Sequence, residues 1–240
     1  VCRSLVGGEE LAGDAPAIDK IYPATGEVIA RIEPADDTVL DRAVEIAAAA
    51  QKEWALRSGH DRAQVLARAA RLLREHNDEL ARIEVLDVGK VYGEAVSADV
   101  PSGADAMDFF AALAQTDTGD MRRYPDAIAY CERVPLGICA GIGAWNYPVQ
   151  IACWKAAPAL AAGNAFILKP SELTPLTAHR VAELLGDAGL PDGLFQIVHG
   201  DHKVGRAICA HPGIAKISLT GGVDTLSLIH ISEPTRLDGI

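Results

Sequence analysis

Hydrophobic and polar positions in the first half of the chain alternate at the spacing of amphipathic helices. From Asp36, whose carboxylate suits a helix N-cap, apolar side chains recur at helical spacing as far as Trp54. Two short strand-like runs precede this region and flank the turn Pro23-Ala-Thr-Gly26. The same helical pattern predicts further helices over residues 64–75, 78–87 and 104–114. We therefore expect the first half to supply a helical layer and a few edge strands.

The second half alternates short apolar runs with helix-like stretches. Residues 121–134 first indicate two short strands around Pro125-Asp126. Expected strands then follow over residues 137–142, 164–168, 195–198 and 214–219, with helices over 148–162, 175–188 and 204–210. This alternation predicts a Rossmann-type parallel sheet with right-handed crossovers. Such sheets bind ligands at strand carboxyl ends, so we place a ligand on the loops after Ile142, Leu168, Val198 and Leu219.

Composition and charge narrow the class of protein. The 240 residues carry 33 acidic and 22 basic side chains, a net charge of −11, which argues against a nucleic-acid or anionic-membrane surface. No apolar run is long enough to span a bilayer, and the N-terminus lacks the pattern of a signal peptide, so we expect a cytoplasmic protein. The five cysteines are widely spaced without a C-x-x-C motif, which disfavours a disulfide framework or a zinc site.

The loop after the first strand of this alternation contains a candidate oxyanion-binding amide. Asn146 follows that strand, and Pro148 suits the first position of the next helix. A side-chain amide beside the free N–H groups of a helix start can stabilise a developing oxyanion. The alternative is that both residues only shape a turn and a helix start.

The loops after the next strand and after the last strand suit a nucleotide. Lys169 can donate to, and Glu172 can accept from, a pair of vicinal hydroxyls such as those of an adenosine ribose. The alternative is an ordinary helix start capped by Ser171 or Thr174. After the last strand, the glycine turn that ends at Gly222 would let the backbone approach a pyrophosphate, although any strand-ending turn could look alike.

Three side chains of the helix after Pro148 also have two interpretations. Lys155 stands among apolar residues, where a charge is costly unless it is paired or reaches water. Tyr147 and Trp154 are two helical turns apart, so they face the same way and could embrace a cation or pack in the core.

The stretch from Arg133 to Asn164, followed by Lys169-Pro-Ser-Glu-Leu-Thr-Pro175, resembles the NAD(P)-dependent aldehyde dehydrogenase superfamily, and most closely its betaine aldehyde dehydrogenase branch. The resemblance runs from about Pro23 to Thr225 and includes Leu86-Asp-Val-Gly-Lys90. It implies an α/β fold of the aldehyde dehydrogenase type, with a parallel sheet and flanking helices. Residues 1–120 are expected to form an N-terminal helical layer of the cofactor domain. Residues 121–134 are expected to form an oligomerisation-type strand pair, and residues 135–225 a βαβ dinucleotide-binding core.

The resemblance also assigns roles to residues. It implies that Asn146 is the oxyanion-hole amide and that Lys155 acts in charge relay while an aldehyde is oxidised. The implied cofactor is NAD or NADP. The residues expected along its nicotinamide are Gly143, Ala144 and Trp145, and those expected at its adenosine ribose are Lys169, Pro170, Ser171 and Glu172. The residues expected near its pyrophosphate are Gly222, Val223, Asp224 and Thr225.

Substrate and cation sites follow from the same resemblance. Tyr147 and Trp154 match aromatic positions that embrace the trimethylammonium group of betaine aldehyde, which is oxidised to glycine betaine. Backbone carbonyls of Ile21, Asp87 and Leu173 match a potassium site. The expected partner is a small-molecule aldehyde, and the expected assembly of the parent enzyme is a homodimer or homotetramer. Another aminoaldehyde as substrate, or a non-catalytic nucleotide-binding module, remain alternatives.

The chain also departs from the family pattern. The nucleophilic cysteine and the general-base glutamate of these enzymes lie downstream of the glycine turn, and neither has a counterpart here. Residues 226–240 match no part of the pattern, so we interpret them as an artefactual, frame-shifted or adaptor-like tail on an N-terminal piece without a catalytic domain. We expect such a piece to lack dehydrogenase activity. Tyr22 stands where the family commonly has asparagine, close to the expected potassium site.

Overall fold

A mixed six-stranded sheet forms the centre of the molecule. The computed structural model describes residues 1–116 and 118–222. The strand order is β10-β7-β8-β9-β1-β2. Four strands run parallel, namely β7 (Ile138–Ile142), β8 (Ala165–Lys169), β9 (Phe195–Ile197) and β10 (Lys216–Leu219). Two N-terminal strands, β1 (Ser4–Val6) and β2 (Glu9–Leu11), extend the sheet in antiparallel fashion. The predicted parallel sheet is therefore confirmed.

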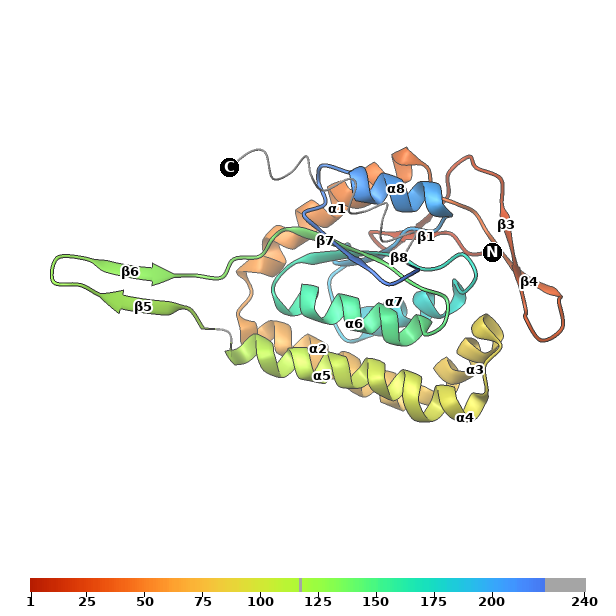
Figure 1. The fold of residues 1–240 in the computed structure, drawn as a ribbon, viewed down its shortest axis with the longest axis horizontal. Coiled ribbons are helices and arrows are strands. Elements are labelled where there is room, and N and C mark those ends of the chain that lie inside the picture. The colour runs from red at the N-terminus through yellow and green to blue at the C-terminus, as the bar shows by residue number, and fades with distance from the viewer. Residues whose placement is uncertain (117, 223–240) are drawn as a thin grey trace.

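Helices cover both faces of this sheet, which explains why its central strands β8 and β9 are buried throughout. Every residue of β8 is buried, as expected for a parallel strand with helices above and below it. Figure 1 shows one pair of helices above the sheet and another pair below it. The upper pair is α1 (Asp37–Leu56) and α8 (His202–Ala210), and the lower pair is α6 (Pro148–Ala161) and α7 (Leu176–Asp187).

A further helical layer lies outside α6 and α7. In this layer α2 packs along α5, and both contact α6, while α3 packs on α7 (Figure 1). The bounds are α2 (Gly59–Glu75), α3 (Asn77–Val88), α4 (Tyr92–Glu94), a π-helical turn η1 (Ala95–Asp99) and α5 (Val100–Thr116). The helices of the first half thus lie on both sides of the sheet, because α1 crosses to the face opposite α2, α3 and α5.

Two hairpins stand apart from the main sheet. The predicted turn at Pro23 joins β3 (Ile18–Ile21) to β4 (Val28–Ile32). The strands predicted within residues 121–134 are β5 (Asp120–Arg123) and β6 (Ile128–Cys131), and every residue of both is exposed. Figure 1 shows this second hairpin extending away from the body of the molecule.

The core joins the layers through one large hydrophobic cluster. Trp54 of α1 is 1% exposed, and its Nε1–H donates to the carbonyl of Leu160 at 2.8 Å. The N-cap expected at Asp36 is present, since Oδ1 accepts from the Val39 N–H at 2.9 Å. Cys139 and Cys153, interpreted from the sequence as core residues, are both buried.

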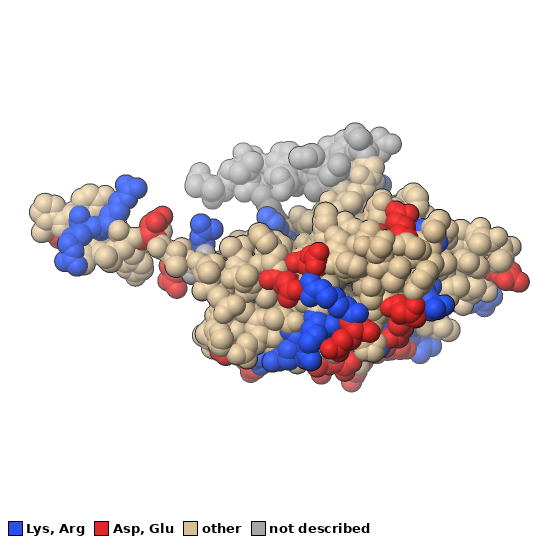
Figure 2. Space-filling view, turned by 90° about the horizontal axis from the view of Figure 1, so that it is seen from below, with Lys and Arg blue, Asp and Glu red and all other residues tan. Residues whose placement is uncertain are grey.

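The outer helical face carries interleaved charges. Figure 2 shows acidic and basic side chains next to one another over this face. Arg74 of α2, for example, pairs with Asp105 and Asp108 of α5 at 2.7 and 2.6 Å. Among residues 1–116 and 118–222, no helix is both long and apolar enough to cross a membrane.

Gly141 of β7 provides a test of the packing between the sheet and α6. A Cβ at this position would lie 2.5 Å from Phe166 Cζ and 3.0 Å from Lys155 Cδ. We expect Gly141→Ala to lower the free energy of unfolding by about 1–3 kcal/mol, because both neighbours would have to move within a packed core. Urea unfolding measures the change. Gly186→Ala is the matched control, since nothing lies within 4 Å of its added Cβ. Equal effects of the two substitutions would contradict this account of the packing.

Candidate functional site

The strand order reverses between β7 and β10, and a crevice opens there. The chain proceeds from β7 through β8 to β9 by way of α6 and α7 on one face, then returns by way of α8 to β10 on the other side of β7. Register pairing aligns Leu219 with Ile142, and Ile142 with Lys169, at the carboxyl ends of three strands. Open α/β sheets bind ligands at this kind of switch point.

A cavity of about 870 Å³ occupies this edge of the sheet. That volume lies within the range of about 300–1,000 Å³ typical of small-molecule sites. Its lining combines the ends of β7, β8 and β10 with one face of α8. The contributions of the three loops are Gly143, Ala144, Trp145 and Asn146; Lys169, Ser171, Glu172 and Leu173; and Thr220, Gly221 and Gly222. The loop after Val198, also proposed from the sequence, contributes no lining residue, and helix α8, which follows it, lines the cavity instead.

Asn146 lies in the cavity wall immediately before α6. The helix begins at Pro148, in the first position that the sequence predicted. The preceding loop is tied to the next strand, because the Gly143 N–H donates to the carbonyl of Lys169 at 2.9 Å. Trp145 is 55% exposed, and Asn146 is partly buried. A side chain with an amide therefore lines the cavity directly before a helix start.

The predicted lysine and glutamate form an ion pair at the cavity edge. Lys169 Nζ lies 3.2 Å from Glu172 Oε2 and also donates to the carbonyl of Pro170 at 3.1 Å. Burial lowers the pKa of Lys169, and the nearby Glu172 carboxylate opposes that shift. The Glu172 side chain is 38% exposed, so its outer oxygen remains open to a ligand. Pro170 supplies only this backbone contact and does not line the cavity.

The alternative reading of the second loop, a cap from Ser171 or Thr174, is not what the structure shows. Helix α7 has no cap from its own N-cap residue, Pro175. Its Thr177 N–H donates instead to Asp87 Oδ2 at 2.9 Å, ninety positions away in the chain. Ser171 Oγ accepts from the Leu173 N–H within the loop.

The glycine turn after β10 completes the described part of the cavity. Nothing lies within 4 Å of a Cβ built at Gly222, so the backbone here is open to a ligand. The other residues expected near a pyrophosphate, Val223, Asp224 and Thr225, lie outside the described residues.

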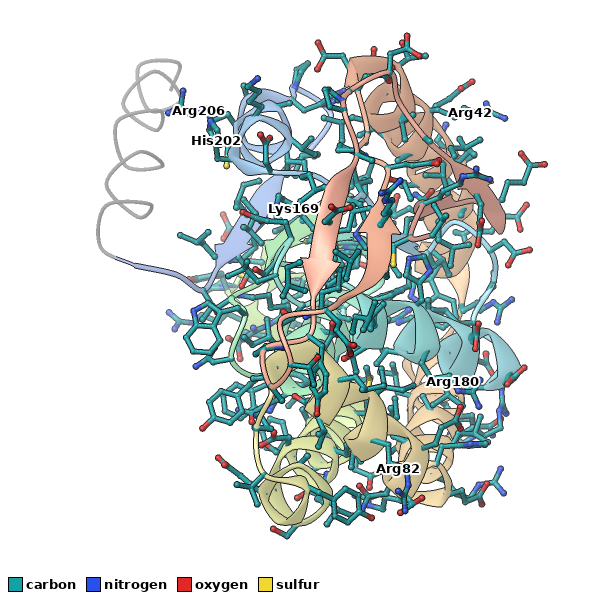
Figure 3. All side chains as sticks on the ribbon, turned by 90° about the vertical axis from the view of Figure 1, so that its right-hand side faces the viewer. Arg42, Arg82, Lys169, Arg180, His202 and Arg206 are labelled. Carbon is teal, nitrogen blue, oxygen red and sulfur yellow. The ribbon has the colours of Figure 1, made fainter. Side chains whose placement is uncertain are left out.

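Helix α8 supplies cavity residues that the sequence analysis missed. His202, Gly205, Arg206 and Cys209 all line the cavity. Figure 3 labels His202 and Arg206 on this helix, and a Cβ built at Gly205 of the same helix would lie 3.8 Å from Lys169 Cδ. Their spacing of i, i+3, i+4 and i+7 defines one helical face, and that periodicity was the available signal.

Lys155 is buried beneath the cavity and does not line it. Its residue is 8% exposed, and Nζ donates to Ser218 Oγ of β10 at 3.0 Å. The side chain therefore does not reach water along its own helix. Burial lowers the pKa of Lys155 from 10.5 to about 8.

Tyr147 and Trp154 occupy separate surroundings. Tyr147 precedes the first residue of α6 and has φ −139° and ψ 63°, so helical spacing does not relate it to Trp154. Lys90 Nζ lies over the Tyr147 ring, 4.0 Å from its centroid, and the Tyr147 hydroxyl donates to Glu94. Trp154 is 52% exposed and lines a smaller hollow with Phe109 and Phe110 of α5. Neither aromatic residue lines the main cavity.

The residues expected to hold potassium do not fit that ion. The carbonyls of Ile21 and Asp87 accept hydrogen bonds from Lys20 Nζ at 2.8 and 2.6 Å. A free cation on these oxygens would meet the lysine ammonium, and the two like charges would repel each other. Leu173, the third expected ligand, is 61% exposed and lines the main cavity. The resemblance therefore misplaces potassium, because Lys20 already supplies a cation.

The five cysteines offer no activated nucleophile at the cavity. Burial raises the pKa of Cys2, Cys139, Cys153 and Cys209, the last of which lines the cavity. Cys131 lies on the exposed β6 strand of the hairpin.

Comparison with known proteins identifies the family. Residues 11–237 match the sequence model of the Aldehyde dehydrogenase family, so the chain belongs to that family. The match passes through residues 226–237, which the sequence analysis set apart and which lie outside the described residues.

Solved structures give the same relationship. PnpE in complex with nicotinamide adenine dinucleotide is 32% identical with a TM-score of 0.93, and the alignment covers 98% of this chain and 49% of that one. Betaine aldehyde dehydrogenase from Staphylococcus aureus is 33% identical with a TM-score of 0.92, covering 98% and 48%. Gamma-glutamyl-gamma-aminobutyraldehyde dehydrogenase from Burkholderia cenocepacia is 35% identical with a TM-score of 0.90, covering 95% and 47%. The chain thus spans about half the length of these relatives.

Lys155 gives the site a predictable pH dependence. Its pKa is about 8 when folded and near 10.5 when unfolded, so the unfolded chain binds more protons between these values. The contribution of Lys155 to the free energy of unfolding therefore rises with pH across this window, by on the order of 2–3 kcal/mol. We expect Lys155→Met to remove this rise.

Urea unfolding at pH 7, 8.5 and 10 measures the effect as the difference between the wild-type chain and the variant. Taking the difference cancels the titration of all other groups. A difference that stays constant from pH 7 to 10 would contradict the lowered pKa of Lys155.

Proposed function

We propose that the cavity binds the pyridine dinucleotide of an aldehyde dehydrogenase, with the adenosine ribose on Glu172 and Lys169. One observation carries this proposal. The carboxylate and the ammonium, 3.2 Å apart, stand at the strand switch point beside a glycine turn open to the cavity. A ribose offers two vicinal hydroxyls, which can donate to the carboxylate and accept from the ammonium.

The loop after β7 suits the nicotinamide. Ala144 and Trp145 line the cavity beside Gly143, and the Asn146 amide points from the same loop. When bound, the dinucleotide supplies the hydride acceptor for an oxidation. The protein's contribution is to position it and to offer Asn146 as the donor to an aldehyde oxygen that becomes negatively charged. Lys155 does not line the cavity, and its influence on this site passes through its hydrogen bond to Ser218 of β10.

Betaine aldehyde is the substrate we propose for the parent enzyme, with NAD as its first cofactor. The aldehyde dehydrogenases of known structure similar to this chain include a betaine aldehyde and an aminoaldehyde enzyme. The aromatic hollow of Trp154, Phe109 and Phe110 shares no lining residue with the cavity that contains Asn146, so the substrate proposal rests on the similarity to these enzymes. Another aminoaldehyde is the nearest rival. Because no described cysteine is activated at the cavity, we propose that this chain binds the cofactor without oxidising an aldehyde.

Assembly and location are part of the same proposal. The exposed hairpin of β5 and β6 has free edges and apolar side chains such as Met121 and Tyr130, which are 66% and 75% exposed. Pairing of such edges with another copy is a common route to homodimers and homotetramers. We also propose a cytoplasmic location for the protein.

A non-catalytic nucleotide-binding module is the alternative from a different class. Assays of the natural gene product against betaine aldehyde and simple aliphatic aldehydes, with NAD and NADP, separate the alternatives. Preferential oxidation of betaine aldehyde supports the proposed substrate, whereas equal rates favour a general aldehyde oxidiser. Dinucleotide binding without any aldehyde oxidation by that product would favour the module.

Glu172 tests the ribose assignment. We expect Glu172→Ala to weaken NAD binding by on the order of 5- to 150-fold, because hydrogen bonds to a charged acceptor are lost. Titration of the chain with NAD, followed by fluorescence, reports binding, since Trp145 lines the cavity. Glu53→Ala is the control, as Glu53 is exposed on α1 outside the cavity. An unchanged dissociation constant in the Glu172 variant would contradict the assignment.

Arg206 tests the choice between NAD and NADP. This guanidinium is exposed on α8 and lines the same cavity as Glu172. The 2′-phosphate of NADP would be repelled by Glu172 and attracted by Arg206, so the balance of these charges sets the preference. We expect Arg206→Ala to weaken NADP binding more than NAD binding, with the difference shrinking as salt is added. Equal loss for both dinucleotides would show that Arg206 does not face the 2′ position.

A further inference from the structure

Lys20 holds an unusual place for a lysine on a short strand. The residue is 2% exposed, and its ammonium donates to the carbonyls of Ile21 and Asp87 at 2.8 and 2.6 Å. The ammonium Nζ also lies 4.0 Å from Asp87 Oδ1. A buried ammonium is costly unless oxygen atoms surround it, and here carbonyl and carboxylate oxygens do so.

This ammonium joins three segments that are distant in the chain. Lys20 and Ile21 belong to the β3–β4 hairpin, and Asp87 is the penultimate residue of α3. The other carboxylate oxygen of Asp87 accepts from the N–H and the hydroxyl of Thr177, at 2.9 and 2.7 Å, and so caps α7. The loop that precedes α7 carries Lys169 and Glu172. The cationic centre therefore braces the segment that forms the ribose end of the cavity.

We propose that Lys20 is a built-in monovalent cation, which takes the place of a free alkali ion on the carbonyls of Ile21 and Asp87. An ammonium and a potassium ion each carry one positive charge, and both are held by carbonyl oxygens in place of water. A tethered cation binds without loss of translational freedom and without dependence on the ionic medium. The chain is therefore stable without potassium.

The packing around the centre supports a fixed occupant. Gly89, which ends α3 with φ +78°, leaves room for the hairpin turn, since a Cβ there would lie 3.0 Å from Pro23 Cβ. The side chains of Lys20 and Asp87 are 1% and 0% exposed. A second cation on these carbonyls would lie next to a buried charge of the same sign.

The first test uses the wild-type chain. Its melting temperature is measured in potassium, sodium and choline chloride at equal ionic strength. The expected result is no difference specific to potassium at any concentration. A saturable rise in potassium alone would show that a free ion binds here or nearby in addition to Lys20, and would overturn the proposal.

The second test removes the ammonium and opens the space. We expect Lys20→Ser to melt at a lower temperature than the wild-type chain in choline and to recover in potassium. The recovery should reach on the order of 5–10 °C at a hundredfold excess over the dissociation constant. Lys20→Met, which fills the space without a charge, should lose stability with no response to potassium. Lys216→Ser, at an exposed position of β10, is the control and should respond to neither change.

A Lys20→Ser chain that folds but ignores potassium would overturn the proposal, because the carbonyls would then not form a cation site. If Lys20→Ser fails to fold in every salt, including saturating potassium, the proposal is likewise overturned, since potassium could not replace the ammonium. The potassium response of the wild-type chain remains an independent measurement in that case.

Discussion

Parallel pairing brings the carboxyl ends of β7, β8 and β10 to one edge of the sheet, and the cavity depends on that pairing. The register aligns Leu219, Ile142 and Lys169 across three strands, so the loops that follow these residues lie next to one another. The crossover helices then enclose the space, because α8 returns on the face opposite α6 and α7. Strand pairing therefore positions loops from distant parts of the chain around one cavity, and contacts between the loops are not required for this.

Three buried lysines show how the fold tolerates charge in its interior. Lys20 is surrounded by two carbonyls and a carboxylate, Lys169 pairs with Glu172, and Lys155 has only the hydroxyl of Ser218. The pKa of each is lowered by burial, and that of Lys155 falls to about 8 without an opposing carboxylate. A lysine with a weakly held proton next to a binding site is suited to proton movement, whereas the two paired lysines are suited to holding structure.

Local sequence signals predicted the elements well, since helix caps and apolar runs act over a few residues. The Asp36 cap, the Pro148 start of α6 and the fully buried β8 all follow from neighbouring residues. The Lys169 and Glu172 pair was also accessible, because both side chains leave one short loop. Contacts across long separations were not accessible from the sequence. Lys20 contacts Asp87 across 67 positions, and only the folded chain shows that the carbonyls of Ile21 and Asp87 both accept from its ammonium.

Tyr147 and α8 show two further reasons for such failures. The spacing between Tyr147 and Trp154 implied a shared helical face, but the helix begins after Tyr147, and its backbone leaves the helical region. The predicted start of the helix at Pro148 was right, and the error was to apply helical spacing to Tyr147, one residue before that start. For α8, the periodic face of His202, Gly205, Arg206 and Cys209 was visible, but its orientation depended on which side of the sheet the crossover takes.

Cofactor binding and thiolate chemistry place different demands on the residues of a chain of this family. The strand ends, the glycine turn and the α8 face together line a volume of the size of a small-molecule site. A thiolate nucleophile needs a lowered pKa in an electropositive setting. The one cysteine in the wall, Cys209, has its pKa raised by burial, and the buried Cys153 has a pKa near 12. Among the described residues the cavity wall therefore offers no activated thiolate, whereas its volume and its Lys169–Glu172 pair suit a nucleotide.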